Sequence, residues 1–487
     1  MRLPSPRLIA AVLATAALGG CATNPVTGKQ DVVLMSEAQE IQMGREANAQ
    51  IMQEYTRYDD EALQAYVNQV GQRIAAASHR PNLQYTFTVL DSPEVNAFAV
   101  PGYIYITRGI MAYLNSEAEL VAVLGHEVGH VTARHAVRQQ TGAAATGVGA
   151  TVIGILTGSG DLANVANMAG TALVSGYGRD KELEADNLGA QYVARLGYDP
   201  DAMIDVVRLL KNQESFEIQQ ARAENRKPHI YHGLFATHPD NDTRLQEAIK
   251  AAHKAGDQGQ YPDGRQVYLD HVKGLPFGSS AAQGIVRGSR FYPADMGFTL
   301  AFPGAWTIDN APSKVVAYPT QKDAFLELYA MPVPPNVGPR EFLARNLQGV
   351  TLTSSEPLQV NGLQGYAAVA QSVKLPWGNY GPARFAVVYL NNMAYVFRGA
   401  TRVGSSMAGS DPLFMSSIRT FRRLKDNEFA LAEPQRIELM QATPRTRIES
   451  LATSSPIRPY PAEQLRLLND LYPDKEPAPG QTLKIVN

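Results

Sequence analysis

His126, Glu127 and His130 form the pattern His-Glu-x-x-His. Residues four apart lie on one face of a helix, so both imidazoles can bind one metal ion. Glu127 is rotated off that line and can address a water molecule beside the ion. Residues 119–124, which precede the pattern, are largely apolar and helix-forming, and burying two histidines beside a glutamate without a metal would be costly. The pattern therefore predicts a Zn²⁺ site on a partly buried helix, with Glu127 as the general base of a hydrolase.

A hydrolytic zinc site needs a third protein ligand and leaves the fourth position to water. The metzincin pattern would supply a histidine six residues after His130 and a glycine three residues after it, but this chain has Ala136 and Ala133 there. His135 lies five residues after His130 and is interpreted as a structural or surface residue. A purely structural zinc site is also disfavoured, because such sites fill all four positions with cysteine or histidine and the chain has a single cysteine.

Glu182 is the better candidate for the third ligand, in the segment Glu-Leu-Glu-Ala-Asp at 182–186. If the segment is helical, Glu182 and Asp186 share a face one turn apart. Glu182 can then bind the ion while Asp186 accepts the outer N–H of a ligand imidazole. Glu184 points elsewhere and is expected to be solvated or paired. Spacing alone leaves the assignment of the third ligand open.

The elements that must position these residues are local and recognisable. The pattern of residues 116–138 predicts the motif helix, and residues 179–196 predict a second helix that ends at Gly197. Alternating apolar residues predict strands at 85–90, 95–100 and 103–107, which form a small sheet around the Pro101-Gly102 turn. Residues 141–178 are small and apolar, which favours either a mobile helical pair over the active site or buried core helices.

Residues 95–244 resemble the zinc metallopeptidase family that includes HtpX and the CAAX prenyl endopeptidases, and most of all its BepA-like periplasmic branch. The matching pieces are Asn-Ala-Phe and Pro-Gly before the motif helix, the His-Glu-x-x-His pattern with its following Arg-His, the Glu-x-Glu-Ala-Asp segment, and Thr-His-Pro with a later arginine. The resemblance implies a mostly helical gluzincin fold and assigns the third ligand to Glu182. It also places His238 near the metal, as a removable fourth ligand or a transition-state contact, with Arg244 assisting; a loop histidine that caps a turn is the alternative.

The implied activity is zinc-dependent cleavage of polypeptides. Glu127 would take a proton from water and deliver it to the leaving amine. An extended substrate would pair with the edge strand at Asn96, Ala97, Phe98 and Ala99, by analogy with other proteins that accept peptides by strand addition. Unfolded or mobile segments should therefore be the preferred substrates.

The N-terminus predicts a lipid-anchored envelope protein. Arg2 and Arg7 precede an apolar run at 8–18 that is shorter than the about 20 residues of a spanning helix. Leu-Gly-Gly-Cys at 18–21 resembles a bacterial lipobox, so residues 1–20 are interpreted as a signal peptide and Cys21 as the lipidation site; an ordinary signal peptide is the alternative. Ala22 in place of aspartate suggests the periplasmic side of the outer membrane. Cys21 is the single cysteine, so no disulfide is expected.

The length of 487 residues suggests two to four domains of roughly 100 to 200 residues each. We predict an α+β protein with a tether at 21–35, the peptidase domain at 36–255, a linker at 256–286, a small α/β sandwich domain at 287–425 and a C-terminal module at 430–487. Strands are expected at 297–301, 324–330, 365–371, 385–390 and 393–399, and helices near 339–346 and 412–417.

The two C-terminal regions depart from the BepA branch, which carries helical repeats there. Residues 287–425 resemble the Mog and PsbP type of sandwich, and residues 430–487, predicted as strand, helix, helix, strand, resemble a LysM module. Such modules bind peptidoglycan, so the cell wall is a candidate partner; domains that only pack or present substrate are the alternative.

The composition of the chain gives no support for a nucleic-acid-binding protein. A net charge of −2, with 45% hydrophobic and 18% charged residues, is typical of a globular protein and gives no reason to expect a nucleic-acid partner. Two functions remain: a protease of envelope protein quality control, and a chaperone-like or peptidoglycan-tethered binding protein whose metal site is silent. An intact Glu127 favours the protease.

Overall fold

The computed structural model describes residues 21–33, 35–145, 178–224, 226, 228, 262–311, 314–402, 405 and 407–487. The predicted signal peptide at 1–20, most of the 141–178 segment, His238 and Arg244 lie outside these residues. The chain divides into two compact units, one made of residues up to Phe277 together with Arg436–Asn487, and the other of Gly278–Gln435. Each unit is described separately below.

A three-stranded sheet lies at the centre of the first unit. Its strands are β3 (Thr86–Leu90), β4 (Ala97–Val100) and β5 (Tyr103–Thr107), in the order β3-β5-β4. β3 runs parallel to β5, and β4 runs antiparallel to β5 across the tight turn at Pro101 and Gly102. The small sheet expected upstream of the motif helix is confirmed. Because β4 pairs only with β5 among the described strands, it is one of the two edge strands of this sheet, and β3 is the other.

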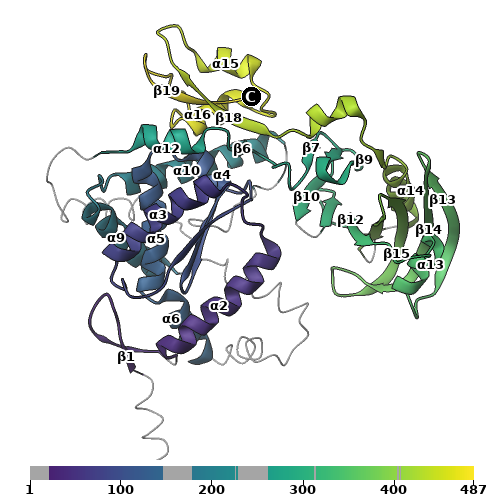
Figure 1. The fold of residues 1–487 in the computed structure, drawn as a ribbon, viewed down its shortest axis with the longest axis horizontal. Coiled ribbons are helices and arrows are strands. Elements are labelled where there is room, and N and C mark those ends of the chain that lie inside the picture. The colour runs from purple at the N-terminus through teal and green to yellow at the C-terminus, as the bar shows by residue number, and fades with distance from the viewer. Residues whose placement is uncertain are drawn as a thin grey trace, which may run out of the picture. The chain divides into compact units, whose positions relative to one another are not determined.

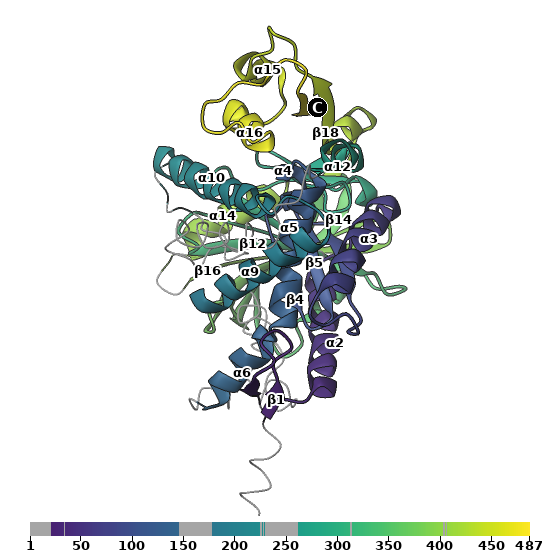
Figure 2. The ribbon, with the colours of Figure 1, turned by 90° about the vertical axis from the view of Figure 1, so that its left-hand side faces the viewer.

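Helices surround this sheet. They are α2 (Glu37–Glu54), α3 (Glu61–Ala77), α4 (Arg108–Tyr113), α5 (Glu117–Thr132), α6 (His135–Ala145), α9 (Arg179–Arg195), α10 (Ala202–Ala223) and α12 (Arg265–Val272). Side-chain caps fix where several of them begin: Ser36 closes a capping box at α2, and the carboxylate of Asp60 accepts from the Leu63 N–H at α3. Figure 2 shows α5 inside the unit, with α9 on one side and α3 on the other. All residues of α5 are buried.

The segment predicted as a tether contains a short hairpin, β1 (Cys21–Thr23) paired antiparallel with β2 (Gln30–Val32). Its turn is stabilised by Asn24, whose side-chain oxygen accepts hydrogen bonds from the backbone N–H groups of Val26 (2.8 Å) and Thr27 (3.1 Å). Across the part of the chain that is described, no helix combines the length and the hydrophobicity that crossing a bilayer requires.

The C-terminal residues belong to the first unit. They form β18 (Gln435–Gln441), α15 (Ile448–Ser454), α16 (Pro461–Leu468) and β19 (Thr482–Val486), the strand, helix, helix, strand order expected from the sequence. β18 lies between β19 and β6 (Pro276–Phe277), and Figure 1 shows these elements beside α4, α10 and α12. Leu468 and Leu483 pack in the same hydrophobic core as the buried residues of α5. The side chain of Lys484 is buried and donates to the carbonyl oxygens of Ala112 (2.7 Å) and Leu114 (2.6 Å), just before α5.

The second unit is built on a seven-stranded antiparallel sheet in the order β10-β11-β12-β16-β15-β14-β13. Its elements are β10 (Thr307–Ala311), β11 (Lys314–Tyr318), β12 (Ala324–Pro332), α13 (Pro339–Asn346), β13 (Leu352–Val360), β14 (Leu363–Lys374), β15 (Tyr380–Leu390), β16 (Met393–Thr401) and α14 (Met407–Ile418). A four-stranded sheet, β17-β9-β8-β7, completes it with β7 (Ile285–Arg287), β8 (Arg290–Tyr292), β9 (Phe298–Ala301) and β17 (Arg422–Arg423), and two 3-10 helices lie at Ala294–Met296 and Asp426–Ala432.

Both faces of the seven-stranded sheet are covered. Phe414 of α14 packs in one hydrophobic core with Phe397 of β16, whereas Phe342 of α13 packs in a second core with Phe385 of β15. Each of the five segments expected to be strands in this region lies mainly within a strand, but β7, β8, β10, β11, β13 and β17 were missed. β13 is largely exposed, so its sequence lacks the regular apolar alternation that marks a half-buried strand. The whole chain is a mixed α+β protein, with a helical domain that carries a small sheet and a β-rich region after it.

Candidate metal centre and active site

The motif helix α5 begins at Ser116, whose hydroxyl accepts a hydrogen bond from the Glu119 N–H at 3.1 Å. Glu117 anchors the same end of the helix, because its carboxylate accepts from the side chains of Tyr66 (2.9 Å), Arg73 (2.7 Å) and Tyr198. These contacts hold the start of α5 against α3 and the chain after α9. The helix that carries the motif is therefore fixed well before the motif is reached.

Helix α9 packs unusually close to α5 through residues without large side chains. A Cβ added at Gly129 would lie 2.9 Å from the carbonyl oxygen of Ala185, and one added at Gly189 would lie 3.0 Å from the backbone nitrogen of His126. Glycine at both positions lets the two backbones approach. This close approach brings the N-terminal turns of α9 beside the histidines of α5.

His126, His130 and Glu182 meet at one point. Each offers a ligand atom, and the three atoms lie within 4.8 Å of one another. Nε2 of His126 is 2.9 Å from Nε2 of His130, and Oε2 of Glu182 is 3.3 Å and 3.5 Å from these two nitrogens. The structure thus brings together the three residues predicted to bind the metal, from two helices far apart in sequence.

The chemistry of this group fits a zinc ion. Two imidazole nitrogens and one carboxylate oxygen are the ligand types of a catalytic zinc site with an open position. All three side chains are at least 95% buried, and a buried carboxylate is costly unless a cation or a donor neutralises it. A divalent cation held by His126, His130 and Glu182 supplies that charge.

The outer nitrogen of His126 is bound by Asp186. Nδ1 of His126 lies 2.8 Å from Oδ1 of Asp186, whose carboxylate is buried one helical turn beyond Glu182. Metal-binding histidines usually donate their second N–H to a carboxylate, which fixes the tautomer and the ring orientation. Asp186 is placed to do this for His126, with Nε2 left facing the metal position.

The outer nitrogen of His130 is bound by a residue that was not expected there. Nδ1 of His130 lies 2.7 Å from Nδ1 of His135, and Nε2 of His135 lies 3.1 Å from Oε2 of Glu184. Arg138 donates to the same oxygen of Glu184 at 2.7 Å. His135 is fully buried, so the structural role offered for it agrees with the structure and the surface role does not. Glu184 is paired, not solvated. Burial raises the pKa of Glu184, but the donors His135 and Arg138 outweigh it and lower the pKa to about 2.

Glu127 lies on α5 between the two histidines and is 3% exposed. Burial raises the pKa of its carboxyl to about 8, with a smaller opposing effect from His126. A bound cation would oppose this shift, because positive charge favours the ionised carboxylate. An ionised carboxylate at this position can accept a proton from a water molecule and return it, which is the property that general base catalysis needs.

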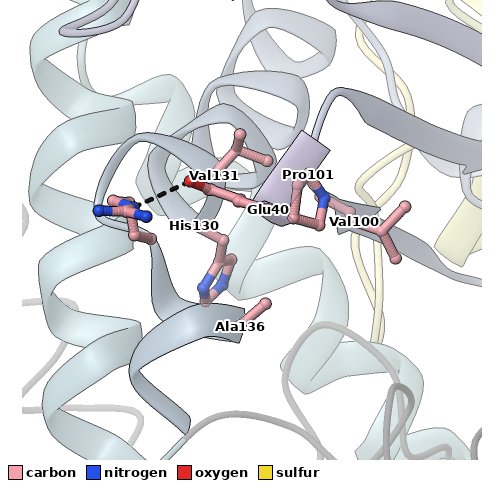
Figure 3. A pocket seen from close by; sticks show the side chains of 8 residues that line it. Glu40, Val100, Pro101, His130, Val131 and Ala136 are labelled. Atoms are coloured by element: carbon pink, nitrogen blue, oxygen red, sulfur yellow. Dashed lines mark hydrogen bonds and ion pairs between the residues drawn. The ribbon is translucent and has the colours of Figure 1, made fainter. Parts of the chain in front are cut away.

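The edge strand β4 ends beside the metal ligands. A small pocket of about 10 Å³ lies between the end of β4 and the end of α5, lined by Ala99, Val100 and Pro101 on one side and by His130 on the other. Figure 3 shows Val100, Pro101 and His130 around it, with Glu40 of α2 beside them. The volume suffices for about one water molecule. The pocket is narrow, but it shows that the predicted substrate strand and His130 line a common space.

The four residues of the predicted substrate strand differ in exposure. Asn96 and Ala97 are buried, and the carbonyl oxygen of Asn96 accepts from the Thr107 N–H of β5 at 3.0 Å. Phe98 and Ala99 are partly exposed, and the ring of Phe98 stacks on that of Tyr105 at 4.9 Å. The roles expected for His238 and Arg244 remain predictions, because neither residue is described.

Comparison with known proteins agrees with this geometry. Residues 61–252 match the model of peptidase family M48. The beta-barrel assembly-enhancing protease of Escherichia coli is 30% identical over 265 residues, which cover 51% of this chain and 52% of that protein. The mitochondrial metalloendopeptidase OMA1 of Arabidopsis thaliana is 34% identical over 144 residues, which cover 29% of each chain. The chain thus spans about half the length of the beta-barrel assembly-enhancing proteases it matches.

Among solved structures, cyanobacterial PsbP from Synechocystis covers 29% of this chain and 96% of its own, with 15% identity and a TM-score of 0.24. A score that low carries no conclusion about the fold. The family match and the buried ligand group lead to one result. Residues 61–252 match peptidase family M48 and form a zinc metallopeptidase region, with His126, His130 and Glu182 as its metal-binding group.

Proposed function

We propose that the protein is a zinc-dependent endopeptidase of the cell envelope that cleaves misfolded or mobile segments of periplasmic or outer-membrane proteins. One observation carries the proposal: the buried group of His126, His130 and Glu182 with Glu127 on the same helix. The relatives named as proteases of beta-barrel assembly support the envelope setting.

The residues of the chain have separate roles in this reaction. Zinc, when bound, would polarise the scissile carbonyl and acidify the attacking water. Glu127 accepts the proton of that water and returns it to the leaving amine. Asp186 orients His126. The family resemblance implies that His238 acts at the metal, either to stabilise the transition state or as a removable fourth ligand that holds the resting enzyme inactive, and that Arg244 assists it.

Substrate chains would bind as an extended strand along Asn96, Ala97, Phe98 and Ala99. This proposal is supported by the position of β4 at the edge of its sheet and by the pocket that its end shares with His130. Main-chain hydrogen bonds to an edge strand require an unfolded or flexible substrate segment. A denatured protein should therefore be cleaved much faster than its folded form, and equal rates for the two would refute this binding mode.

We further propose that Cys21 carries a lipid anchor on the periplasmic side of the outer membrane, and that residues 430–487 form a LysM-like module that binds peptidoglycan. The lipobox-like sequence supports the anchor, and the strand, helix, helix, strand order of β18, α15, α16 and β19 supports the module. Residues 287–425, with helices on both faces of an antiparallel sheet, are proposed to be an α/β sandwich domain that packs or presents substrate.

The wall-binding proposal needs the full chain, because the terminal segment shares its core with the peptidase residues. Sedimentation with insoluble peptidoglycan should retain the protein, with a non-binding protein of similar charge as the control. Full recovery in the supernatant would exclude the module. Loss of membrane association in Cys21→Ser, with normal export, would establish the anchor, and unchanged membrane association would exclude it.

The decisive experiment for the activity is Glu127→Gln. The amide keeps the shape of the carboxylate but cannot accept a proton, so casein cleavage should fall about 10²–10⁴-fold while one zinc per chain is retained. Glu54→Gln, at an exposed position of α2, is the control and should behave as the wild type. A Glu127→Gln variant with full proteolysis would refute the mechanism. Wild-type protein that binds zinc but cleaves no denatured protein, together with full cellular function of Glu127→Gln, would favour a chaperone-like role.

A further inference from the structure

Among the residues that the structure describes, His135 is the histidine that contacts a metal-binding histidine without being placed to bind the ion itself. It lies five residues after His130, and in an unbroken helix that spacing would rotate it about 140° away from the face that carries His130. A direct contact between the two rings therefore requires a break in the helix. α5 ends at Thr132 and α6 begins at His135.

The break is built around Arg134. Its φ of 55° lies in the left-handed region, which is unfavourable for a residue other than glycine. Its buried guanidinium holds the turn in place by donating to Glu40 of α2 at 2.9 Å and to the carbonyl oxygen of Met35 at 3.1 Å. Glu40 also accepts from Arg80 at 2.8 Å, and Arg80 donates to the Val131 carbonyl at 3.2 Å. The left-handed turn at Arg134, held by Glu40 and by the Met35 carbonyl, therefore reverses the chain so that His135 contacts His130.

The hydrogen bonds beyond His130 have one consistent direction when that ring binds a metal. Nε2 of His130 is the ligand atom, so the ring carries its proton on Nδ1 and donates it to Nδ1 of His135. His135 then carries its own proton on Nε2 and donates it to Glu184 at 3.1 Å. Arg138 holds the carboxylate of Glu184 at 2.7 Å. Both nitrogens of His135 are used, and the buried ring needs no other partner.

We propose that His135, supported by Glu184 and Arg138, is a positioning residue for zinc: it fixes the tautomer and the ring plane of His130, as Asp186 does for His126. The proposal rests on the proposed metallopeptidase function for its biological meaning, but its physical content is metal binding. α9 would then serve both ligand histidines, through Asp186 for the first and through Glu184 and His135 for the second.

Two substitutions separate positioning from packing. His135→Leu keeps much of the volume but accepts no hydrogen bond, whereas His135→Asn places an amide oxygen close to the position of Nδ1 and keeps the acceptor. Loss of such a partner typically weakens metal binding 10–100-fold. We expect His135→Leu to raise the zinc Kd by about that factor, and His135→Asn to recover most of the affinity. Glu184→Ala should give a smaller loss, because it acts through His135.

The measurements are zinc Kd by competition with a chelator, the visible absorption spectrum of the cobalt-substituted protein, and Tm with and without metal. His135→Leu should alter the cobalt spectrum and reduce the increase in Tm that zinc gives. His79→Leu is the control, since His79 bonds Tyr192 at 2.8 Å but does not contact a ligand histidine, and it should keep the wild-type Kd.

Two results would overturn the proposal: a wild-type zinc Kd and cobalt spectrum in His135→Leu, or equal losses in His135→Leu and His135→Asn with matching falls in the Tm of the metal-free proteins. The second result would mean that His135 only fills space. These readouts do not depend on catalysis, so a protein without protease activity would refute the proposed function and still test this inference.

Discussion

Gly129 lies in the contact between α5 and α9, and replacing it with alanine tests whether that contact sets the metal geometry. The added Cβ would lie 2.9 Å from the Ala185 carbonyl oxygen and 3.2 Å from the Ala185 Cα. Ordinary contacts begin near 3.4 Å, so the helices must separate locally by about 0.5 Å. Ala185 precedes Asp186 and lies one helical turn from Glu182. A displacement of α9 at Ala185 therefore also displaces Glu182, the third ligand.

The size of the expected effects follows from these distances. Overpacking lowers the free energy of unfolding by about 1–3 kcal/mol, and the higher helix propensity of alanine raises it by about 1 kcal/mol. The protein should therefore remain folded. Metal-ligand distances tolerate only about ±0.2 Å, which is less than the displacement. We therefore expect the zinc Kd of Gly129→Ala to rise at least about tenfold, equivalent to about 1.4 kcal/mol.

Gly71→Ala is the matched control. Its Cβ would lie 2.4 Å from the ring of Phe87, so it overpacks α3 against β3 in the same unit, away from the α5–α9 contact. It should lower the stability without changing the zinc Kd. The assay is chelator competition for zinc, with urea unfolding of the metal-free proteins. An unchanged Kd in Gly129→Ala, or an equal loss in Gly71→Ala, would refute the reasoning.

Three further predictions concern other contacts of the first unit. Asp186→Asn should weaken zinc binding about 10–100-fold in a chelator competition, because the amide no longer fixes the tautomer of His126; an unchanged Kd would contradict the role given to Asp186. Burial raises the pKa of Glu117, but hydrogen bonds from three neighbouring side chains outweigh it and hold the pKa below its usual value. The ionised Glu117 carboxylate therefore stabilises the folded protein fully above the unfolded-state pKa of 4.5, and this stabilisation is lost as the pH falls below that value. In urea titrations of the metal-free proteins, the free energy of unfolding should fall more from pH 6 to pH 3 for the wild type than for Glu117→Gln. Equal pH dependence in the two proteins would contradict this. Leu468→Ala should destabilise the unit that contains the metal site by about 2–5 kcal/mol in a single unfolding transition, whereas a separate early transition would show that the C-terminal segment folds independently.

Local periodicity predicted much of the first unit. The strands around Pro101, the motif helix and the helix that ends before Gly197 were all recognisable, because each is specified by the spacing of its own apolar residues and by the turn residues next to it. The placement of His126 and His130 on one face follows from helix geometry in the same way. These features need no knowledge of where any other segment lies.

The sequence by itself determined the motif, its zinc chemistry and the order of the elements; the tertiary structure decided which residues meet. Spacing could nominate Glu182 but could not bring it to the histidines, because that depends on close backbone contact between two helices through Gly129 and Gly189. Spacing also left open whether His135 is structural or on the surface, because its contact with His130 depends on the left-handed turn at Arg134, which Glu40 holds from a helix far away in the sequence. The pattern of β18, α15, α16 and β19 was visible, but not that its apolar residues pack in the core of the motif helix. The periodicity of a segment shows which of its faces is buried. Which other segment packs against that face depends on shape and charge complementarity across the whole fold.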